Sequence, residues 1–461
     1  MHHTADAIRA QRRFFHTQRR HSDCLGIFNL LTSDLLFDEL ESRLPQHRER
    51  CFPPTETLAM FVSQSLNSDR SCQQIVNQAA VQRLLTGLPV CSTHTGGYCR
   101  ARQRLPLDLV SGLASHVGQQ IDQQVPDRWR WQGRRVRLVD GTTVTMPDTS
   151  ANQAAYPKHG GQKSGLGFPI CRIVGITCLS SGALLNAAVG RFNGKGGDEQ
   201  TLLRSIQDTL EPGDMLLGDA FFPTYFFLAA MQARGVDILM EQMGARKRTT
   251  DFRRGKRLGA RDHLITLHKP KSRPDWMTDA DFQSAPKTLT VREFKAGGKI
   301  MITTLNCPGD APKAELKTLY KQRWSVELDI RNIKETMGMD VLSCKTPQMV
   351  LKEIWVHLLA YNLIRLLIVQ AALAVDTTPR EISFKHCLQL WLAFSLQLDT
   401  SSDEQMGVLL ILIAQQQVGN RPGRIEPRAV KRRPKPYPLL SVPRAQARQT
   451  VRKFGHPEKL K

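Results

Sequence analysis

The sequence lacks the cysteine and histidine patterns that build disulfide frameworks or zinc sites. Its ten cysteines lie at scattered spacings without a Cys-x-x-Cys pair, and its thirteen histidines form no H-E-x-x-H motif. No N-terminal segment has the pattern of a signal peptide. We therefore expect reduced thiols and a cytoplasmic location.

Long uninterrupted hydrophobic runs are also lacking. The most apolar segment, EIWVHLLAYNLIRLLIVQAALAV, contains four polar interruptions: Glu353, His357, Asn362 and Arg365. Charged groups are costly in the middle of a bilayer. The segment is therefore predicted to be a core helix rather than a membrane span.

Acidic residues are outnumbered by basic ones. The chain has 42 Asp and Glu against 64 Lys and Arg, a net charge of +22 and a pI of about 9.9. This surplus favours a polyanionic partner, because it raises both the affinity and the association rate for nucleic acid. A basic soluble protein without such a partner is the alternative. At 461 residues, with 41% hydrophobic, the chain is globular and long enough for roughly two to four domains.

Helical patterns dominate residues 1–130, with TETLAMFVSQSL and SCQQIVNQAAVQRLL as examples. The segment STHTGGYCRARQRLPLDLV follows a Ser/Thr/Gly turn and places Arg100, Arg102 and Arg104 beside Tyr98. We predict a helix that contacts DNA through these side chains, with a solvated basic helix as an equal alternative.

Strand patterns begin at Arg134 and continue to about residue 235. In order they are RRVRLVDGTTVTM, the hairpin FPICRIVGITCL and GALLNAAVGRF around Ser-Ser-Gly, a helix near Glu199 to Leu210, and GDMLLGDAFF. Three antiparallel strands, one helix and another strand form the opening order of an RNase H-like fold. The predicted class is therefore α/β with a mixed sheet.

Residues 236–315 interrupt this domain with β-rich segments such as DHLITLHKP and KTLTVREFKAGGKIMITTL. Between Arg246 and Arg261 they carry eight basic side chains against Asp251 alone, and we expect Arg254 and Lys256 to contact DNA. Helical patterns then return, so that residues 131–235 and 316–400 are predicted to form one domain around the insertion.

Residues 401–461 are predicted to form a helix followed by a basic tail. From Arg421 onward the tail is rich in proline, and we expect it to be extended or disordered when unbound. Binding to target or donor DNA and a purely solubilising role are both open for it.

Three acids from distant parts of the chain can converge in this fold. Asp140 ends a strand in VDGTTV, Asp219 ends another in GDAFF, and Glu327 lies on a later helix. Three carboxylates suit Mg²⁺ or Mn²⁺. A pair of such ions about 4 Å apart activates an attacking oxygen and stabilises the leaving oxygen in phosphodiester displacement.

Each acid alone is ambiguous, because an aspartate at a strand end is more often a turn former or a helix cap. Asp148, Glu241 and Asp262 are rival acids in strand or loop contexts. Asp329 and Glu335 lie on the same predicted helix as the third acid but point to other faces.

The segment LYKQRWSVELDIRNIK, residues 319–334, distinguishes Glu327 from these rivals. As an α-helix it places four polar side chains within an arc of about 60°: Tyr320, Arg323, Glu327 and Lys334. Arg323 and Tyr320, one and two turns before Glu327, are suited to hold phosphate oxygens. Lys334, two turns beyond, is expected to touch DNA further from the cleavage point.

The spacing Tyr320-x₂-Arg323-x₃-Glu327-x₆-Lys334 resembles the Y-R-E-K signature of IS4-family transposases at every interval. The segments VDGTTV and GDAFF resemble the first and second catalytic regions of that family, and the resemblance covers roughly residues 90–400. It implies a DDE triad of Asp140, Asp219 and Glu327 that binds two Mg²⁺ or Mn²⁺ ions. It also implies contacts from Tyr320, Arg323 and Lys334 to the backbone of the transposon end.

The resemblance further implies a cut-and-paste transposase that acts on DNA as a homodimer, in a bacterial cytoplasm at the nucleoid. Metal-activated water would release a 3′-OH, which forms a hairpin and later joins target DNA. The N-terminal helices would recognise the inverted repeats, and the C-terminal helices would help to dimerise. Alternatives are a domesticated Mg²⁺-dependent nuclease and a non-catalytic DNA-binding regulator of transposition.

A hairpin requires a distorted end with a base held on an aromatic ring. Trp276 in the insertion and Trp324 in the Y-R-E-K segment are the candidates. For Trp324, packing in the core is the stronger expectation.

Overall fold

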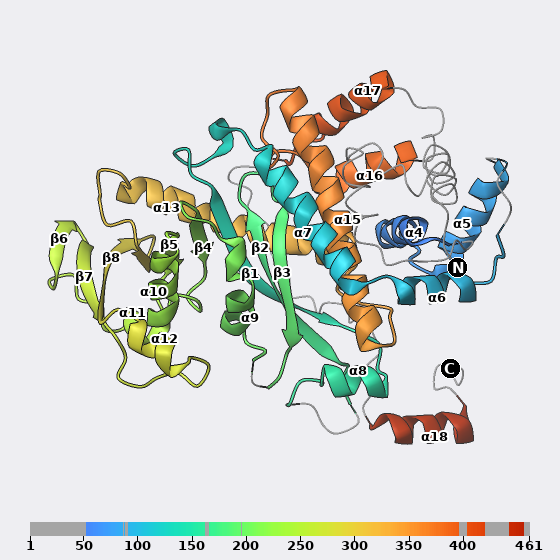
Figure 1. Cartoon of the computed structure of the whole chain (residues 1–461), viewed down its shortest axis with the longest axis horizontal. Helices are drawn as coiled ribbons and strands as arrows, with labels where there is room; N and C mark the ends of the chain where they lie inside the picture. Colours follow the sequence, from blue (N-terminus) through green and yellow to red (C-terminus); the bar gives the residue numbers. More distant parts are fainter. Residues whose placement is uncertain are drawn as a thin grey trace, which may run out of the picture.

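The computed structural model describes residues 52–85, 87, 91–161, 166–194, 196–395, 403–419 and 442–455. Within these residues the chain forms a sheet of nine strands in the order β3-β2-β1-β4-β5-β9-β8-β7-β6 (Figure 1). The strands are β1 (Val136–Thr145), β2 (Ile170–Cys178), β3 (Leu184–Arg191), β4 (Met215–Gly218), β5 (Asp237–Glu241), β6 (Lys256–Gly259), β7 (Asp262–His268), β8 (Thr288–Ala296) and β9 (Lys299–Thr303).

The first five strands form the mixed half of the sheet. β2 pairs antiparallel with both β1 and β3, whereas β4 pairs parallel with β1 and β5 pairs parallel with β4. The turn between β2 and β3 needs a glycine, because Gly182 has a φ of 75° and a Cβ there would lie 2.7 Å from the Arg365 guanidinium. This strand order confirms the predicted RNase H-like fold class.

The insertion does not form a separate sheet. β9 pairs antiparallel with β5, and β8, β7 and β6 extend the same sheet outward. β5 lies inside the range predicted for the insertion, yet its parallel ladder with β4 makes it a strand of the central sheet.

Helices cover both faces of the sheet. One face packs against α7 (Leu107–Gln123), α13 (Lys313–Lys321), α14 (Ser325–Arg331) and α15 (Pro347–Ala374). The other face packs against α9 (Glu199–Ser205) and α10 (Tyr225–Ala233). Shorter elements around this core are η1 (Asp127–Trp129), α8 (Ser150–Ala155), η2 (Gln207–Thr209), α11 (Gly244–Lys247) and α12 (Asp279–Ser284).

α15 is the one described helix that is long and apolar enough to cross a membrane. The most apolar window of this helix is 89% buried inside the protein, which identifies it as a core helix as predicted. Its polar interruptions have partners within the fold: Asn362, for example, donates to the backbone oxygens of Ala114 and Leu184, both at 2.8 Å.

Helices also lie before and after this core. The N-terminal group shares a small hydrophobic cluster and consists of α4 (Pro54–Leu66), α5 (Cys72–Leu85) and α6 (Gly96–Arg104). The C-terminal helices are α16 (Phe384–Ser395), α17 (Asp403–Ala414) and α18 (Arg444–Phe454).

The prediction of an extended tail is wrong for residues 444–454. They form α18, and Arg444 at its start pairs with Asp148 at 2.6 Å. The remainder of the predicted tail, except residues 442, 443 and 455, lies outside the described residues.

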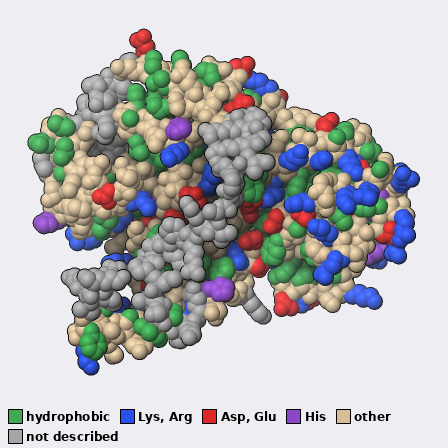
Figure 2. Space-filling view, turned by 180° about the vertical axis from the view of Figure 1, so that it is seen from behind, with side chains coloured by type: hydrophobic (Ala, Val, Ile, Leu, Met, Phe, Trp, Pro, Cys, Tyr) green, Lys and Arg blue, Asp and Glu red, His purple; other side chains and the backbone are tan. Residues whose placement is uncertain are grey.

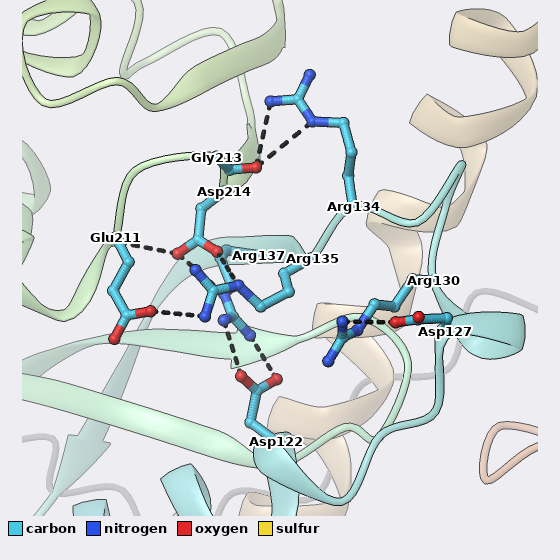
Figure 3. A network of polar contacts seen from close by, with 9 residues as sticks. All are labelled: Asp122, Asp127, Arg130, Arg134, Arg135, Arg137, Glu211, Gly213 and Asp214. Atoms are coloured by element: carbon cyan, nitrogen blue, oxygen red, sulfur yellow. Dashed lines mark hydrogen bonds and ion pairs between the residues drawn. The ribbon is translucent and has the colours of Figure 1, made fainter.

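Ion pairs fix the start of β1 to the elements around it (Figure 3). The Arg137 guanidinium donates to both oxygens of Asp122 on α7, at 2.6 and 2.8 Å, and lies 3.2 Å from Asp214 before β4. Arg135 pairs with the same Asp214 at 2.9 Å and with Glu211 at 2.6 Å. This network holds β1 and β4 side by side at the end opposite the predicted acids.

Candidate active site

Adjacent parallel strands bring the first two acids together. Leu138 of β1 lies opposite Leu217 of β4. Asp140 and Asp219 each follow two residues later, so they occupy corresponding positions where β4 ends. The backbone N–H of Phe221 donates to Asp219 Oδ1 at 2.8 Å and fixes that carboxylate at the turn.

The third acid faces the first two across the sheet surface. Glu327 lies on α14, and its negative charge, with that of Asp219, acts on the Asp140 carboxyl. Burial is the largest cause and the two neighbouring charges add to it, so the pKa of Asp140 rises to about 6. The structure therefore brings the three predicted acids into one electrostatic group.

The segment that carries Glu327 is not the single regular α-helix that we predicted. A 3₁₀ turn, η3 (Gln322–Trp324), separates α13 from α14, and a π-helical segment, η4 (Asn332–Thr336), follows α14. π-helical turns add a residue to the local repeat, and they are frequent at functional sites. The orientation of Lys334 is therefore not given by α-helical phase.

Arg323 lies between two of the acids. Its Nη2 is 2.7 Å from Glu327 Oε1, and its Nη1 is 3.5 Å from Asp140 Oδ2. The guanidinium is mostly buried, with 17% of its side chain exposed. A cation therefore already neutralises this pair of carboxylates from within the protein.

The donor set fits a hard divalent cation in its chemistry. Three carboxylates supply the oxygen ligands that Mg²⁺ and Mn²⁺ prefer, and the Arg323 guanidinium is a stand-in cation between two of them. Among the described residues, no three His, Cys, Asp or Glu side chains are already arranged around a common metal position. Arg323 thus engages one oxygen of Glu327 and lies close to one oxygen of Asp140.

The other two members of the Y-R-E-K spacing hold the site to the sheet. The Tyr320 hydroxyl donates to the Gly218 carbonyl at 3.3 Å, directly before Asp219, and burial raises the pKa of this phenol to about 12. Lys334 donates to Thr142 Oγ1 at 3.2 Å and to the Thr143 carbonyl at 2.8 Å, just beyond the first acid on β1.

The rival acids are all engaged elsewhere. Asp148 pairs with Arg444, Glu241 with Lys247 and Lys299, and Asp262 with Arg292. Asp329 is fully buried on the opposite side of α14, where Arg365 and Arg380 pair with it at 2.6 and 2.7 Å. This contact anchors the helix that carries the third acid to α15.

Two of the predicted DNA contacts on α6 are wrong. Tyr98 is fully buried, and Arg102 is 8% exposed, with its Nη2 3.0 Å from Cys72 Sγ and its guanidinium over the Tyr98 ring. Arg100 and Arg104 on the same helix are exposed and line a cavity of about 360 Å³. The helical spacing alone does not separate the inward arginine from the outward ones.

The cationic segment of the insertion lies at the surface. Arg254 and Lys256 are both exposed. Figure 2 shows Lys and Arg side chains spread over the lobe that holds this insertion. Trp276 is 48% exposed, with its ring 4.0 Å from the Arg204 guanidinium and edge-on to Phe226.

Trp324 is not a core residue, so that expectation is wrong. Its side chain is 58% exposed directly after Arg323, because the 3₁₀ turn carries it away from the sheet. None of the described residues makes a ring or cation–π contact with it.

Glu199 lies beside the site and was not among the residues predicted from the sequence. Glu199 begins α9, and its charge and that of Asp219 act on each other. An acid in the first turn of a helix is ordinarily explained by the helix dipole, so its sequence context carried no functional signal.

An aspartate within β1, an aspartate directly after β4 and a helical glutamate on an RNase H-like sheet define the DDE class of nucleic-acid enzymes. The chain belongs to the family described as Transposase DDE domain, which matches residues 131–363. It is a distant relative of the transposase InsG for insertion sequence element IS4 of Escherichia coli (strain K12). The two are 28% identical over 428 residues, which cover 89% of this chain and 94% of the relative.

A solved structure also resembles the chain, the piggyBac transposase synaptic complex with hairpin DNA determined by cryo-EM. The TM-score is 0.42 with 9% identity, and the match covers 89% of this chain and 88% of the other. The resemblance to IS4-family transposases that the sequence motifs indicated is thus confirmed by the family match and the relative.

Proposed function

We propose that this DDE transposase cleaves the ends of its own insertion sequence and joins them to target DNA by a cut-and-paste route. The observation that carries the proposal is that the charges of Asp219 and Glu327 both act on Asp140, with the Arg323 guanidinium between Asp140 and Glu327. A pure DNA-binding regulator gains nothing from carboxylates that face phosphate, because they repel the DNA backbone unless cations intervene.

The three acids would hold two Mg²⁺ or Mn²⁺ ions, which supply activation of the attacking water and stabilisation of the leaving oxygen. Arg323 exchanges its carboxylate partners for a phosphate oxygen of the DNA end when the acids take up metal. Tyr320 keeps Asp219 in place through the Gly218 carbonyl, and Lys334 does the same for the end of β1.

The DNA path is proposed from exposed cations on both sides of the site. Arg254 and Lys256 of the insertion and Arg100 of α6 are exposed and suited to contact phosphates. The N-terminal helices would bind the inverted repeats, and two protomers would pair two ends.

A hairpin intermediate is part of the proposal, and Trp324 is its best base holder. The indole is exposed and follows Arg323, so a base drawn out of the stack next to the scissile phosphate meets it directly. Trp276 is the second candidate, but Arg204 already lies over its ring at 4.0 Å.

The decisive experiment uses DNA carrying the inverted repeats that flank the coding region, incubated with purified protein and Mg²⁺. We expect cleavage at the ends and covalent joining to a target plasmid, both lost in Asp140→Asn. Cleavage without any joining would support the domesticated nuclease instead, and neither activity with intact end binding would support the regulator.

A further inference from the structure

A fourth carboxylate lies beside the acids of the catalytic centre. Glu199 begins α9, on the face of the sheet opposite α14. Its place is fixed by the next residue, because Gln200 Nε2 donates to the Phe221 carbonyl at 2.6 Å. The Phe221 N–H in turn holds Asp219 at 2.8 Å, so the start of α9 and the second acid share one short loop.

A glycine provides the space that Glu199 occupies. A Cβ on Gly141 would lie 2.5 Å from Cδ and 2.6 Å from Oε1 of Glu199. The carboxylate therefore rests against the bare Cα of the residue that follows Asp140. Any side chain at position 141 would push the carboxylate away, so the glycine lets a fourth acid approach from the second face of the sheet.

The Glu199 carboxylate is short of partners. It accepts no hydrogen bond from the described residues, and its nearest cation, Arg172 Nε, is 3.6 Å away. That Nε is itself buried without a hydrogen-bond partner, while Arg172 Nη1 donates to the Gly197 carbonyl at 2.8 Å. A partly buried carboxylate next to another acid is unfavourable unless a further cation shares it.

The charges around Glu199 also favour an additional cation beside this carboxylate. Burial raises the pKa of Glu199, Arg172 lowers it in part, and the charge of Asp219 adds to the rise. Two divalent ions also carry more positive charge than three carboxylates neutralise, and each needs about six oxygen ligands, some from water. Glu199 approaches from the face of the sheet that α9 covers, whereas Glu327 approaches from the face that α14 covers.

We propose that Glu199 is a positioning residue of the catalytic centre, whose carboxylate supports the binding of a second divalent cation beside Asp219. The inference rests on the proposed metal-dependent function and names a residue outside the DDE triad. Glu199 acts on the ion directly or through one bound water. The absence of a side chain at Gly141 leaves the space that the Glu199 carboxylate occupies.

The test counts and titrates Mn²⁺ bound to the metal-free full chain by electron paramagnetic resonance, without DNA. We expect two ions on the wild type. In Glu199→Gln the weaker ion should lose affinity by roughly 10- to 100-fold, the range for residues that support metal ligands. Gly141→Ala keeps the carboxylate but displaces it and should reproduce the loss. Asp208→Asn removes an 88% exposed carboxylate outside the site and should change nothing.

The possible outcomes separate the inference from the proposed function. The role of Glu199 is overturned if the wild type binds fewer than two ions. It is also overturned if Glu199→Gln binds both ions as the wild type does, while Asp140→Asn shows weaker binding. Unchanged Mn²⁺ binding in Asp140→Asn overturns the metal triad itself. Should Glu199→Gln unfold, Gly141→Ala provides the test by itself. The glycine has an ordinary φ, and the three atoms nearest to an added Cβ all belong to the flexible Glu199 side chain.

Discussion

Arg323 Nη2 lies 2.7 Å from Glu327 Oε1, one helical turn away, so that the third acid of the triad is held by its own helix. The same guanidinium reaches Asp140 at 3.5 Å. An i, i+4 pair on an exposed helix contributes little, but both side chains here are mostly shielded from water. Without metal and DNA, the arginine keeps mutually repelling carboxylates together.

The position of Arg323 predicts a measurable effect on end binding. Arg323→Ala should weaken binding to inverted-repeat DNA, and the slope of log K against log salt should fall by roughly 0.9 for one lost phosphate contact. Fluorescence anisotropy at several salt concentrations measures both quantities. Arg331→Ala, which removes an exposed arginine of α14, is the matched control. An unchanged slope would mean that Arg323 serves only the carboxylates.

Glu327 should be needed for cleavage but not for binding. Glu327→Gln keeps the shape and can still accept a hydrogen bond from Arg323, yet it removes a charge that metal binding requires. We expect cleavage to fall by roughly 10²- to 10³-fold, the range for loss of a central electrostatic group, with end affinity within about twofold of the wild type. Glu335→Gln, exposed on the same segment, controls for loss of surface charge. Cutting by Glu327→Gln at the normal rate would remove it from the triad.

The sequence predicted those parts of the site that depend on topology and spacing. Both aspartates were predicted to end strands: Asp219 does follow β4 directly, whereas β1 continues beyond Asp140 to Thr145. The parallel pairing of β1 with β4 still brings the two residues together. The predictions that were wrong or missing concern which side of a helix or strand faces the interior of the protein. Arg102 is buried against rings and a cysteine although its helix is basic, and Glu199 on α9 lies against Gly141 of β1, a contact between distant parts of the chain.

The prediction of one regular α-helix over residues 319–334 was wrong for a similar reason. The π-helical segment that contains Lys334 does not follow from side-chain propensities, because tertiary contacts such as the bonds from Lys334 to Thr142 and Thr143 hold it against β1. The spacing identified the residues, and packing against β1 set their directions.

Asp140 gives the metal-free protein a defined dependence on pH. Its pKa rises from 3.8 to about 6 on folding, so between these values the folded chain holds a proton that the unfolded chain releases. The stabilisation is fully present below pH 4 and is lost as pH rises to 6. Asp140→Asn cannot titrate, so in EDTA it should be more stable than the wild type at pH 8, by at most about 3 kcal/mol.

Thermal unfolding of both proteins at pH 4 and pH 8 measures this difference. The advantage of the variant should shrink to nothing at the lower pH. Asp208→Asn, at a side chain that is 88% exposed, controls for loss of one carboxylate. Equal melting temperatures at pH 8 would show that burial and the neighbouring charges do not raise the pKa of Asp140.

The indole of Trp324 predicts a defect confined to one step. Trp324→Ala removes the exposed ring beside Arg323, so first-strand nicking should continue while hairpin formation falls by roughly 10-fold or more, because stacking of one base contributes about 1–3 kcal/mol. Pre-nicked ends analysed on denaturing gels isolate that step. Trp276→Ala is the comparison, and a larger defect there would transfer the role to the insertion.

Asp329 predicts how strongly the catalytic helix is anchored. Its carboxylate is fully buried between Arg365 and Arg380, so Asp329→Ala would leave the buried Arg365 without its anion. Loss of one partner from a buried ion pair costs about 3–5 kcal/mol. Asp376→Ala breaks a pair whose acid is 81% exposed and should cost under about 1 kcal/mol. Urea unfolding followed by circular dichroism compares the two. If they lose similar stability, the anchor of α14 is its apolar face, through Val326 and Ile330, rather than this ion pair.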